Sequence, residues 1–310
     1  MLTSELAYVA AVTRDIDAAA AVFTNVLDLP RTDLPGPDGQ DVPVFSVGRS
    51  ALALFEPGDP GVDGTDRTGI HHFALAASDP AAVRDAAAAA GVGAGASRAA
   101  LGGGEAFDLD PAETRGVLAR LSPPLDLPPP SGWVERFDHI GISTNDCAGT
   151  EACFAGKLGY EVESRQSDVE VSIAVESFTS DKYGIVYHNR PPRRVGGGRV
   201  VFITIGDTEL EVIEPLEFGP DAPDVQHGER GDTRQDMGTL ARYVDRRGPG
   251  LHHVAFKVPD ADDALRRARE AGCRMIDDRG RPGSRRAMIG FIHPAALGGI
   301  LVHFDAREEI

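Results

Sequence analysis

Residues 200–215 have the sequence Val200-Val-Phe-Ile-Thr-Ile-Gly-Asp-Thr-Glu-Leu-Glu-Val-Ile-Glu-Pro215. Two alternating apolar segments flank a Gly-Asp turn, and this period of two predicts a β-hairpin. The same pattern occurs earlier, because Val42-Pro-Val-Phe-Ser-Val-Gly-Arg-Ser-Ala-Leu-Ala-Leu-Phe-Glu-Pro57 aligns with it without gaps. The chain therefore contains an internal repeat, and the fold follows from it.

The repeat extends on both sides of the hairpins. Gly69-Ile-His-His-Phe-Ala-Leu75 matches Gly250-Leu-His-His-Val-Ala-Phe256, and each segment leads through an Asp-Pro or Pro-Asp start signal into a predicted helix. The helices end at the Ala-Gly pairs 90–91 and 271–272, and residues 110–121 then match residues 293–304. Strands are also expected at 6–10 and 137–141, each followed by a helix, around 15–27 and 146–157.

Each half of the chain thus contains two units of the form β-α-β-β-β. The predicted fold class is α+β, with four such units in tandem. One unit cannot bury both faces of its curled sheet, so we expect the units to pair into two half-open, barrel-like domains. Residues 122–132 are rich in proline and predict a linker. The expected domains are therefore residues 1–121 and 133–310.

Composition excludes several classes of protein. The 310 residues are 42% hydrophobic and 25% charged, which is typical of a globular chain. No apolar run reaches the roughly 18 residues of a membrane span, and no secretory signal is visible, so we expect a cytoplasmic protein. A net charge of −17 disfavours nucleic acid as a partner. The three cysteines lack C-x-x-C spacing and are read as reduced structural thiols.

The second half resembles the vicinal oxygen chelate superfamily, which includes the glyoxalases and extradiol dioxygenases, and within it the methylmalonyl-CoA epimerases. The resemblance rests on four segments that cover most of residues 134–305. They are Phe137-Asp-His-Ile-Gly-Ile, the 200–215 hairpin, Gly250-Leu-His-His-Val-Ala-Phe and Gly290-Phe-Ile-His-Pro-Ala-Ala-Leu-Gly-Gly-Ile-Leu-Val. The first half resembles the superfamily only.

This resemblance implies one divalent metal ion held by one residue from each of four strands, and it places the ligands at His139, Glu211, His253 and His303. Imidazole and carboxylate suit Fe, Mn, Co, Ni or Zn, and the absence of thiolate favours a catalytic site over a structural zinc site. Each histidine alone would more often be a hydrogen-bonded core or surface residue. Burying all four groups together without a metal would be costly, which favours the metal site. Because side chains alternate along a strand, we expect that His252 and Glu209 do not share the cleft with His253 and Glu211 at the same depth.

The internal repeat offers a comparison within the same chain. The positions in the first half that correspond to the four ligands are Tyr8, Ala53, His72 and Arg120. This set is not able to bind a metal. We therefore expect residues 133–310 to form the metal-binding catalytic domain and residues 1–121 a degenerate, metal-free one.

Two features depart from the family pattern. His303 stands where the family carries a glutamate that can act as a proton acceptor. Residues 167–198 are inserted between two strands, and their alternating pattern predicts an added hairpin. One interpretation is a lid, with Glu170 and Glu176 as candidate bases and Tyr187, His188, Arg190, Arg193 and Arg194 as candidate substrate-binding residues. The other is an edge extension or a dimer contact.

A basic run, Arg279-Gly-Arg-Pro-Gly-Ser-Arg-Arg286, is read as a solvated loop, with contact to a phosphate-bearing thioester as the alternative. For the whole chain we expect an isomerase, epimerase or lyase that acts through a metal-stabilised enolate on a small carbonyl acid or its coenzyme A thioester. The alternatives are an Fe(II)-dependent dioxygenase and a small-molecule-binding protein of the resistance type. The expected partner is a small-molecule substrate, without nucleic acid or membrane, and a homodimer is compatible with the sequence.

Overall fold

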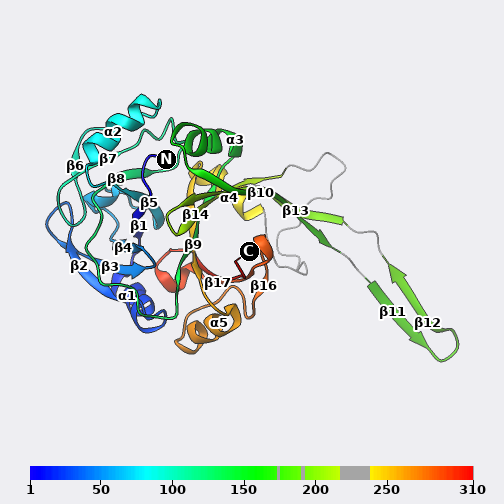
Figure 1. Ribbon diagram of the computed structural model, residues 1–310. Coiled ribbons are helices and arrows are strands. Elements are labelled where there is room, and N and C mark those ends of the chain that lie inside the picture. The colour runs from blue at the N-terminus through cyan, green and yellow to red at the C-terminus, as the bar shows by residue number, and fades with distance from the viewer. Residues whose placement is uncertain (173–174, 190–192, 217–237, 310) are drawn as a thin grey trace.

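The computed structural model of the chain describes residues 1–172, 175–189, 193–216 and 238–309 (Figure 1). The first half forms one eight-stranded sheet with the strand order β2-β3-β4-β1-β5-β8-β7-β6. Its strands are β1 (Leu6–Val12), β2 (Arg31–Pro35), β3 (Asp41–Val47), β4 (Ser50–Phe55), β5 (Gly69–Ala76), β6 (Arg98–Ala99), β7 (Glu105–Asp108) and β8 (Ala119–Ser122). Its helices are α1 (Ile16–Asn25), η1 (Pro60–Val62) and α2 (Pro80–Ala89).

The second half forms a second eight-stranded sheet with the matching order β10-β13-β14-β9-β15-β18-β17-β16. Its strands are β9 (Arg136–Ser143), β10 (Glu161–Ser172), β13 (Arg193–Ile205), β14 (Thr208–Pro215), β15 (Gly250–Lys257), β16 (Arg281–Pro282), β17 (Met288–Ile292) and β18 (Val302–Ala306). Its helices are α3 (Cys147–Glu151), the π-helical segment η2 (Ala152–Lys157), α4 (Gly238–Arg247), α5 (Ala261–Glu270), η3 (Ser284–Arg286) and η4 (Pro294–Leu297). The predicted α+β fold of four β-α-β-β-β units is confirmed, and α4 is a helix that the repeat did not predict.

The first helix of each of the four units begins in the same way. An aspartate at the N-cap accepts a hydrogen bond from the backbone N–H three residues later, which satisfies one of the free donors at the helix start. The donor–acceptor pairs are Ala18 to Asp15, Ala82 to Asp79, Gly149 to Asp146 and Asp263 to Asp260, at 2.8–3.0 Å. The same N-cap interaction thus marks the start of the first helix in each of the four units.

Corresponding strands are paired in the same register in the two sheets. Ala10 on β1 is paired with Ala53 on β4 and His72 on β5, while Gly141 on β9 is paired with Glu211 on β14 and His253 on β15. Because side chains alternate along a strand, this shared register places corresponding residues on corresponding faces of the two sheets. The repeat read from sequence is therefore a repeat in space.

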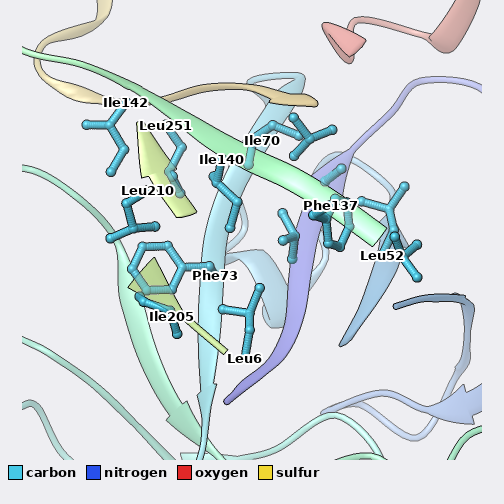
Figure 2. Close-up of a cluster of buried hydrophobic side chains, with 14 of the residues drawn as sticks. Leu6, Leu52, Ile70, Phe73, Phe137, Ile140, Ile142, Ile205, Leu210 and Leu251 are labelled. Atoms are coloured by element: carbon cyan, nitrogen blue, oxygen red, sulfur yellow. The ribbon is translucent and has the colours of Figure 1, made fainter. Parts of the chain in front are cut away.

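The two sheets share one hydrophobic core. Figure 2 shows side chains from both halves in this cluster, among them Leu6 and Phe73 from the first half and Phe137 and Ile140 from the second. Aromatic contacts also cross between the halves, with ring centroids 6.3 Å apart for Phe23 and Phe256. Burial of apolar surface therefore holds the halves together. Among the described residues, no helix combines the length and apolar character that crossing a membrane requires.

Candidate metal centre

The four residues of the expected ligand set lie on four neighbouring strands at the centre of the second sheet. His139 is on β9, Glu211 on β14, His253 on β15 and His303 on β18, and these strands are adjacent in the order β14-β9-β15-β18. All four side chains are buried, with exposed fractions of 3–6%. The shared face of one curled sheet thus brings together residues that are up to 164 positions apart in sequence.

Their donor atoms converge. His139 Nε2 lies 3.2 Å from Glu211 Oε2, and His253 Nε2 lies 3.4 Å from the same oxygen. The two imidazole nitrogens are 3.3 Å apart. The His303 ring lies beside them, with its centroid 4.9 Å from those of His139 and His253. The three histidines each offer a nitrogen within 4.8 Å of the others, which is a spacing that one metal ion can bridge.

Among the described residues, neither ring nitrogen of His303 has a hydrogen-bond partner, although the side chain is buried. Burial holds the pKa of His303 well below its usual value, and the neighbouring His139 and His253 lower it further. His303 is therefore neutral, and one of its ring nitrogens offers a lone pair close to the other donor atoms. An unpartnered buried imidazole is costly unless something else binds it, and a metal ion is the partner that this donor set fits.

The other three candidate ligands, His139, Glu211 and His253, differ from one another in charge. Burial by itself would lower the pKa of His139, but the carboxylate of Glu211 and hydrogen bonds to Asp138 and Glu211 raise it to about 10. Burial would raise the pKa of Glu211, yet the charge and hydrogen bond of His139 and the hydrogen bond to His253 hold it well below its usual value. Burial lowers the pKa of His253. In the metal-free protein an imidazolium at His139 therefore pairs with the Glu211 carboxylate.

His252 does not share the cluster, as expected, but it touches His253. Its Nδ1 lies 3.0 Å from Nδ1 of His253, and its ring packs edge-on against Tyr243 with centroids 4.7 Å apart. Burial, together with the neighbouring His253, lowers the pKa of His252 to about 3. His252 is thus a neutral acceptor that can hold the N–H of His253, which leaves Nε2 of His253 free for a ligand.

Glu209 lies at a different depth from Glu211, as expected, but strand alternation does not put the two on opposite faces. Residues two apart on a strand point to the same face, so Glu209 lies on the same face as Glu211, one step further along β14. Its carboxylate lies 3.3 Å from Arg285 Nη1 and 3.7 Å from Arg307 Nη2. These three side chains, together with Asp138, form an ionic layer next to the four candidate ligands.

The interpretation of residues 279–286 as a solvated loop was wrong for Arg285. Its side chain is 8% exposed, and its guanidinium lies 3.7 Å from the centroid of the Phe202 ring. It points inward because Arg285 has left-handed backbone angles, φ 54° and ψ 32°. Asp138, Arg285 and Arg307 were all missed as site residues. The available signal was an aspartate at position 138, next to His139 in a strand whose residues 137–143 are all buried.

The first-half residue that corresponds to His303 is a buried arginine. Arg120 is 2% exposed, and its Nε donates to Asp108 Oδ1 at 2.5 Å while Nη1 donates to the Gly61 carbonyl at 2.9 Å. Tyr8 and His72 lie beside it, with Tyr8 Oη 3.3 Å from His72 Nε2. A side-chain cation thus lies next to the residues that correspond to His139 and His253.

The inserted segment forms a separate hairpin, β11 (Val175–Ser180) paired with β12 (Gly184–Asn189), which projects from the body of the protein (Figure 1). Tyr187 is 66% exposed on this hairpin and is not brought to the four candidate ligands. Arg190, and the side chains of Glu170, Glu176, His188, Arg193 and Arg194, lie outside the part of the chain that the structure describes.

Two models of the glyoxalase/bleomycin resistance protein/dioxygenase superfamily match this chain, one over residues 5–117 and the other over residues 138–291. Mitochondrial methylmalonyl-CoA epimerase of Bos taurus is 23% identical over 190 residues, covering 60% of this chain and 84% of the relative. The ethylmalonyl-CoA/methylmalonyl-CoA epimerase of Cereibacter sphaeroides is 24% identical over 175 residues, covering 56% of this chain and 98% of the relative.

Among solved structures, a triple mutant of 4-hydroxymandelate synthase from Streptomyces coelicolor aligns with 100% of this chain and 95% of its own, with a TM-score of 0.62. The sequence identity is 16%, so this likeness concerns the fold of the tandem arrangement. Matching family models in both halves and a shared strand register lead to one conclusion. The chain belongs to the glyoxalase/bleomycin resistance protein/dioxygenase superfamily, also called the vicinal oxygen chelate superfamily.

Proposed function

We propose that this protein is a divalent-metal-dependent enzyme and that His139, Glu211, His253 and His303 hold one metal ion. The observation that carries the proposal is the convergence of three donor atoms to within 3.4 Å of one another, beside a buried imidazole whose nitrogens have no hydrogen-bond partner in the described part of the chain. Three imidazoles and one carboxylate suit Fe, Mn, Co, Ni or Zn. Four protein donors also leave room for a bidentate substrate on a six-coordinate ion.

We further infer that the reaction is an isomerisation or epimerisation, or a lyase reaction, of a small carbonyl acid or its coenzyme A thioester. When bound, the metal would supply a Lewis acid that stabilises an enolate. The names of the two epimerase relatives support this class, at 23% and 24% identity. Residues 133–310 would then be the catalytic domain, with residues 1–121 as a scaffold joined to it by residues 122–132.

Within this proposal His303 has a particular role. It replaces the glutamate that the family resemblance implies at this position. As an imidazole it would bind the metal, and it would exchange a proton only when displaced from the metal. The ring is held against Phe291, with centroids 4.4 Å apart. Glu170 and Glu176 as bases, and Tyr187, His188, Arg190 and Arg194 as substrate-binding residues, stay predictions.

The metal assignment is tested by elemental analysis of protein purified without a histidine tag or chelator. We expect about one divalent ion per chain. His253→Ala and Glu211→Ala should lose the ion, whereas the matched first-half variants His72→Ala and Arg120→Ala should keep it. Equal loss of metal from the two pairs of variants would contradict the proposal. A wild-type protein that contains no metal and takes up none on addition would also contradict it, and would favour a small-molecule-binding protein.

The reaction class is tested with methylmalonyl-CoA in D₂O, followed by proton NMR. Loss of the α-proton signal in the presence of metal-loaded protein, and not with Glu211→Ala, is the expected result. A thioester that keeps its α-proton while other carbonyl acids exchange theirs would redirect the substrate assignment within the same class.

An Fe(II)-dependent oxygenase is the second candidate, because His139, His253 and Glu211 by themselves form a two-histidine, one-carboxylate set. This set is associated with oxygen activation at iron. Anaerobic purification followed by metal analysis separates the candidates. Iron that is lost on exposure to air, together with substrate-dependent O₂ consumption, would favour the oxygenase. Stable Co, Ni, Mn or Zn would favour the isomerase.

A further inference from the structure

We propose that Asp138 is a positioning residue for the metal centre, and that Arg285 and Arg307 fix its carboxylate so that it holds the His139 ring in one orientation. The inference rests on the proposed metal site and adds a second layer to it. The carboxylate is completely buried, directly behind the His139 ring, and it does not belong to the quartet of candidate ligands.

The shortest contacts of Asp138 point to this role. Its Oδ2 lies 2.9 Å from His139 Nδ1 and accepts from Arg285 Nη2 at 2.5 Å. Its Oδ1 accepts from Arg307 Nε at 3.1 Å. The two arginines therefore leave the carboxylate little freedom to rotate, since each oxygen is held by a charge-assisted hydrogen bond.

The loop that supplies Arg285 is shaped for this contact. Arg285 and its neighbour Arg286 both have positive φ angles, 54° and 60°, a conformation that is unfavourable for residues with a side chain. Such a conformation persists where surrounding contacts impose it. Here the Arg285 guanidinium lies against Phe202 and between Asp138 and Glu209.

The internal repeat shows that this ionic layer accompanies the quartet. By the shared register, Asp138 corresponds to Ala7 and Glu209 to Ala51. A third carboxylate, Asp305, lies 3.9 Å from Arg307 Nε and corresponds to Ser122. The first half, which lacks the ligands, lacks the carboxylates too. The contact between adjacent histidines behaves differently, because His71 and His72 approach to 2.8 Å in the first half as His252 and His253 do in the second.

The chemical consequence concerns the tautomer of His139. A carboxylate at Nδ1 accepts the N–H of the neutral ring at that atom, so the lone pair stays on Nε2, which faces Glu211 and His253. Carboxylates in this position orient metal-binding histidines, and their removal typically weakens metal affinity by about 10- to 100-fold.

The test uses Co²⁺ added to the full-length protein, with affinity measured by competition with a chelator and geometry by the visible absorption of the bound ion. We expect Asp138→Asn to weaken Co²⁺ binding by about 10- to 100-fold and to change the absorption bands. Asp108→Asn is the matched control. Asp108 is also held by two arginines, Arg98 and Arg120, but in the half without ligands, so Co²⁺ affinity should stay at the wild-type value.

A wild-type affinity and spectrum in Asp138→Asn, in a protein where His139→Ala loses the ion, would overturn the role of Asp138 and leave the metal site standing. No Co²⁺ uptake by the wild type would overturn both. A measurement on the wild-type protein tests the inference even if the Asp138 variant folds poorly. In ¹⁵N-histidine-labelled, Zn²⁺-loaded protein, His139 should carry its proton on Nδ1, and a proton on Nε2 would refute the inference.

Discussion

Gly141 leaves the space that the His253 ring fills. A Cβ atom built on Gly141 would lie 2.0 Å from Cε1 and 2.2 Å from Nδ1 of that ring, far inside contact distance. The two residues are paired across β9 and β15, so the ring lies flat over the glycine backbone. In the first half the residue paired with the corresponding histidine is Ala10, and that half lacks the ligand set.

We therefore predict that Gly141→Ala displaces the His253 ring and lowers metal content sharply, with a smaller effect on folding. Metal stoichiometry by elemental analysis and the unfolding midpoint are the measurements. Gly156→Ala is the control, because a Cβ at Gly156 would meet nothing within 4 Å. Full metal content in Gly141→Ala would show that the ring position is not required.

Metal binding should release protons. His139 is protonated in the metal-free protein, since its pKa is raised to about 10, whereas the pKa values of His253 and His303 are lowered and both rings are already neutral. Binding at pH 8 should therefore release about one proton, and the association constant should rise about tenfold per pH unit until pH approaches 10. Calorimetry in buffers of different ionisation enthalpy measures the number. An affinity independent of pH between 7 and 9 would contradict the assigned charge of His139.

Arg120 should stabilise the first half without affecting the metal. Arg120→Met would remove one of the two arginines that hold the Asp108 carboxylate. The Arg120 side chain is 2% exposed and that of Asp108 36%, so this pair should contribute more than the ~1 kcal/mol of an exposed pair. Arg98→Met, at a more exposed site, should cost less than about 1 kcal/mol. Urea unfolding of both variants, with metal analysis of the folded protein, tests this ordering. Equal costs would mean that burial of Arg120 does not determine its contribution.

The Asp108 pairing also predicts a pH dependence. Burial would raise the pKa of Asp108, but hydrogen bonds and the charges of Arg120 and Arg98 lower it overall. A carboxyl whose pKa is depressed in the folded state stabilises the protein above its unfolded pKa, and this contribution is lost as pH falls through the folded value. The stability difference between wild type and Arg120→Met should therefore shrink below about pH 4. A constant difference down to pH 2 would contradict this.

The projecting hairpin should be dispensable for folding. Ser172 and Arg193 are paired across β10 and β13, so residues 173–192 can be replaced by a two-residue Gly-containing turn. We expect metal content to be unchanged and the unfolding midpoint to shift by only a few degrees, because β11 and β12 form a sheet of their own. If the hairpin contributes to substrate binding, KM rises while metal content stays the same. Loss of the metal from the shortened protein would show that the hairpin contributes to metal binding.

The sequence by itself determined the repeat and the class of fold. These properties are set by local patterns: a period of two in the strands, an aspartate at the start of each unit's first helix, and a register carried unchanged from one half to the other. The four candidate ligands, His139, Glu211, His253 and His303, came from the resemblance of the second half to the vicinal oxygen chelate superfamily, and the structure has these residues on neighbouring strands.

Only the tertiary structure decided which residues contact the candidate ligands from the side away from the proposed metal. Asp138 and Arg285 are 147 positions apart and meet because a left-handed turn directs one arginine inward. Sequence patterns do not encode that direction, so Arg285 was read as solvated. Arg120 likewise looked like a lost ligand, and only the structure shows that it is buried and paired with Asp108. Charged side chains are placed by partners distant in sequence, whereas strands and helices follow from their own residues.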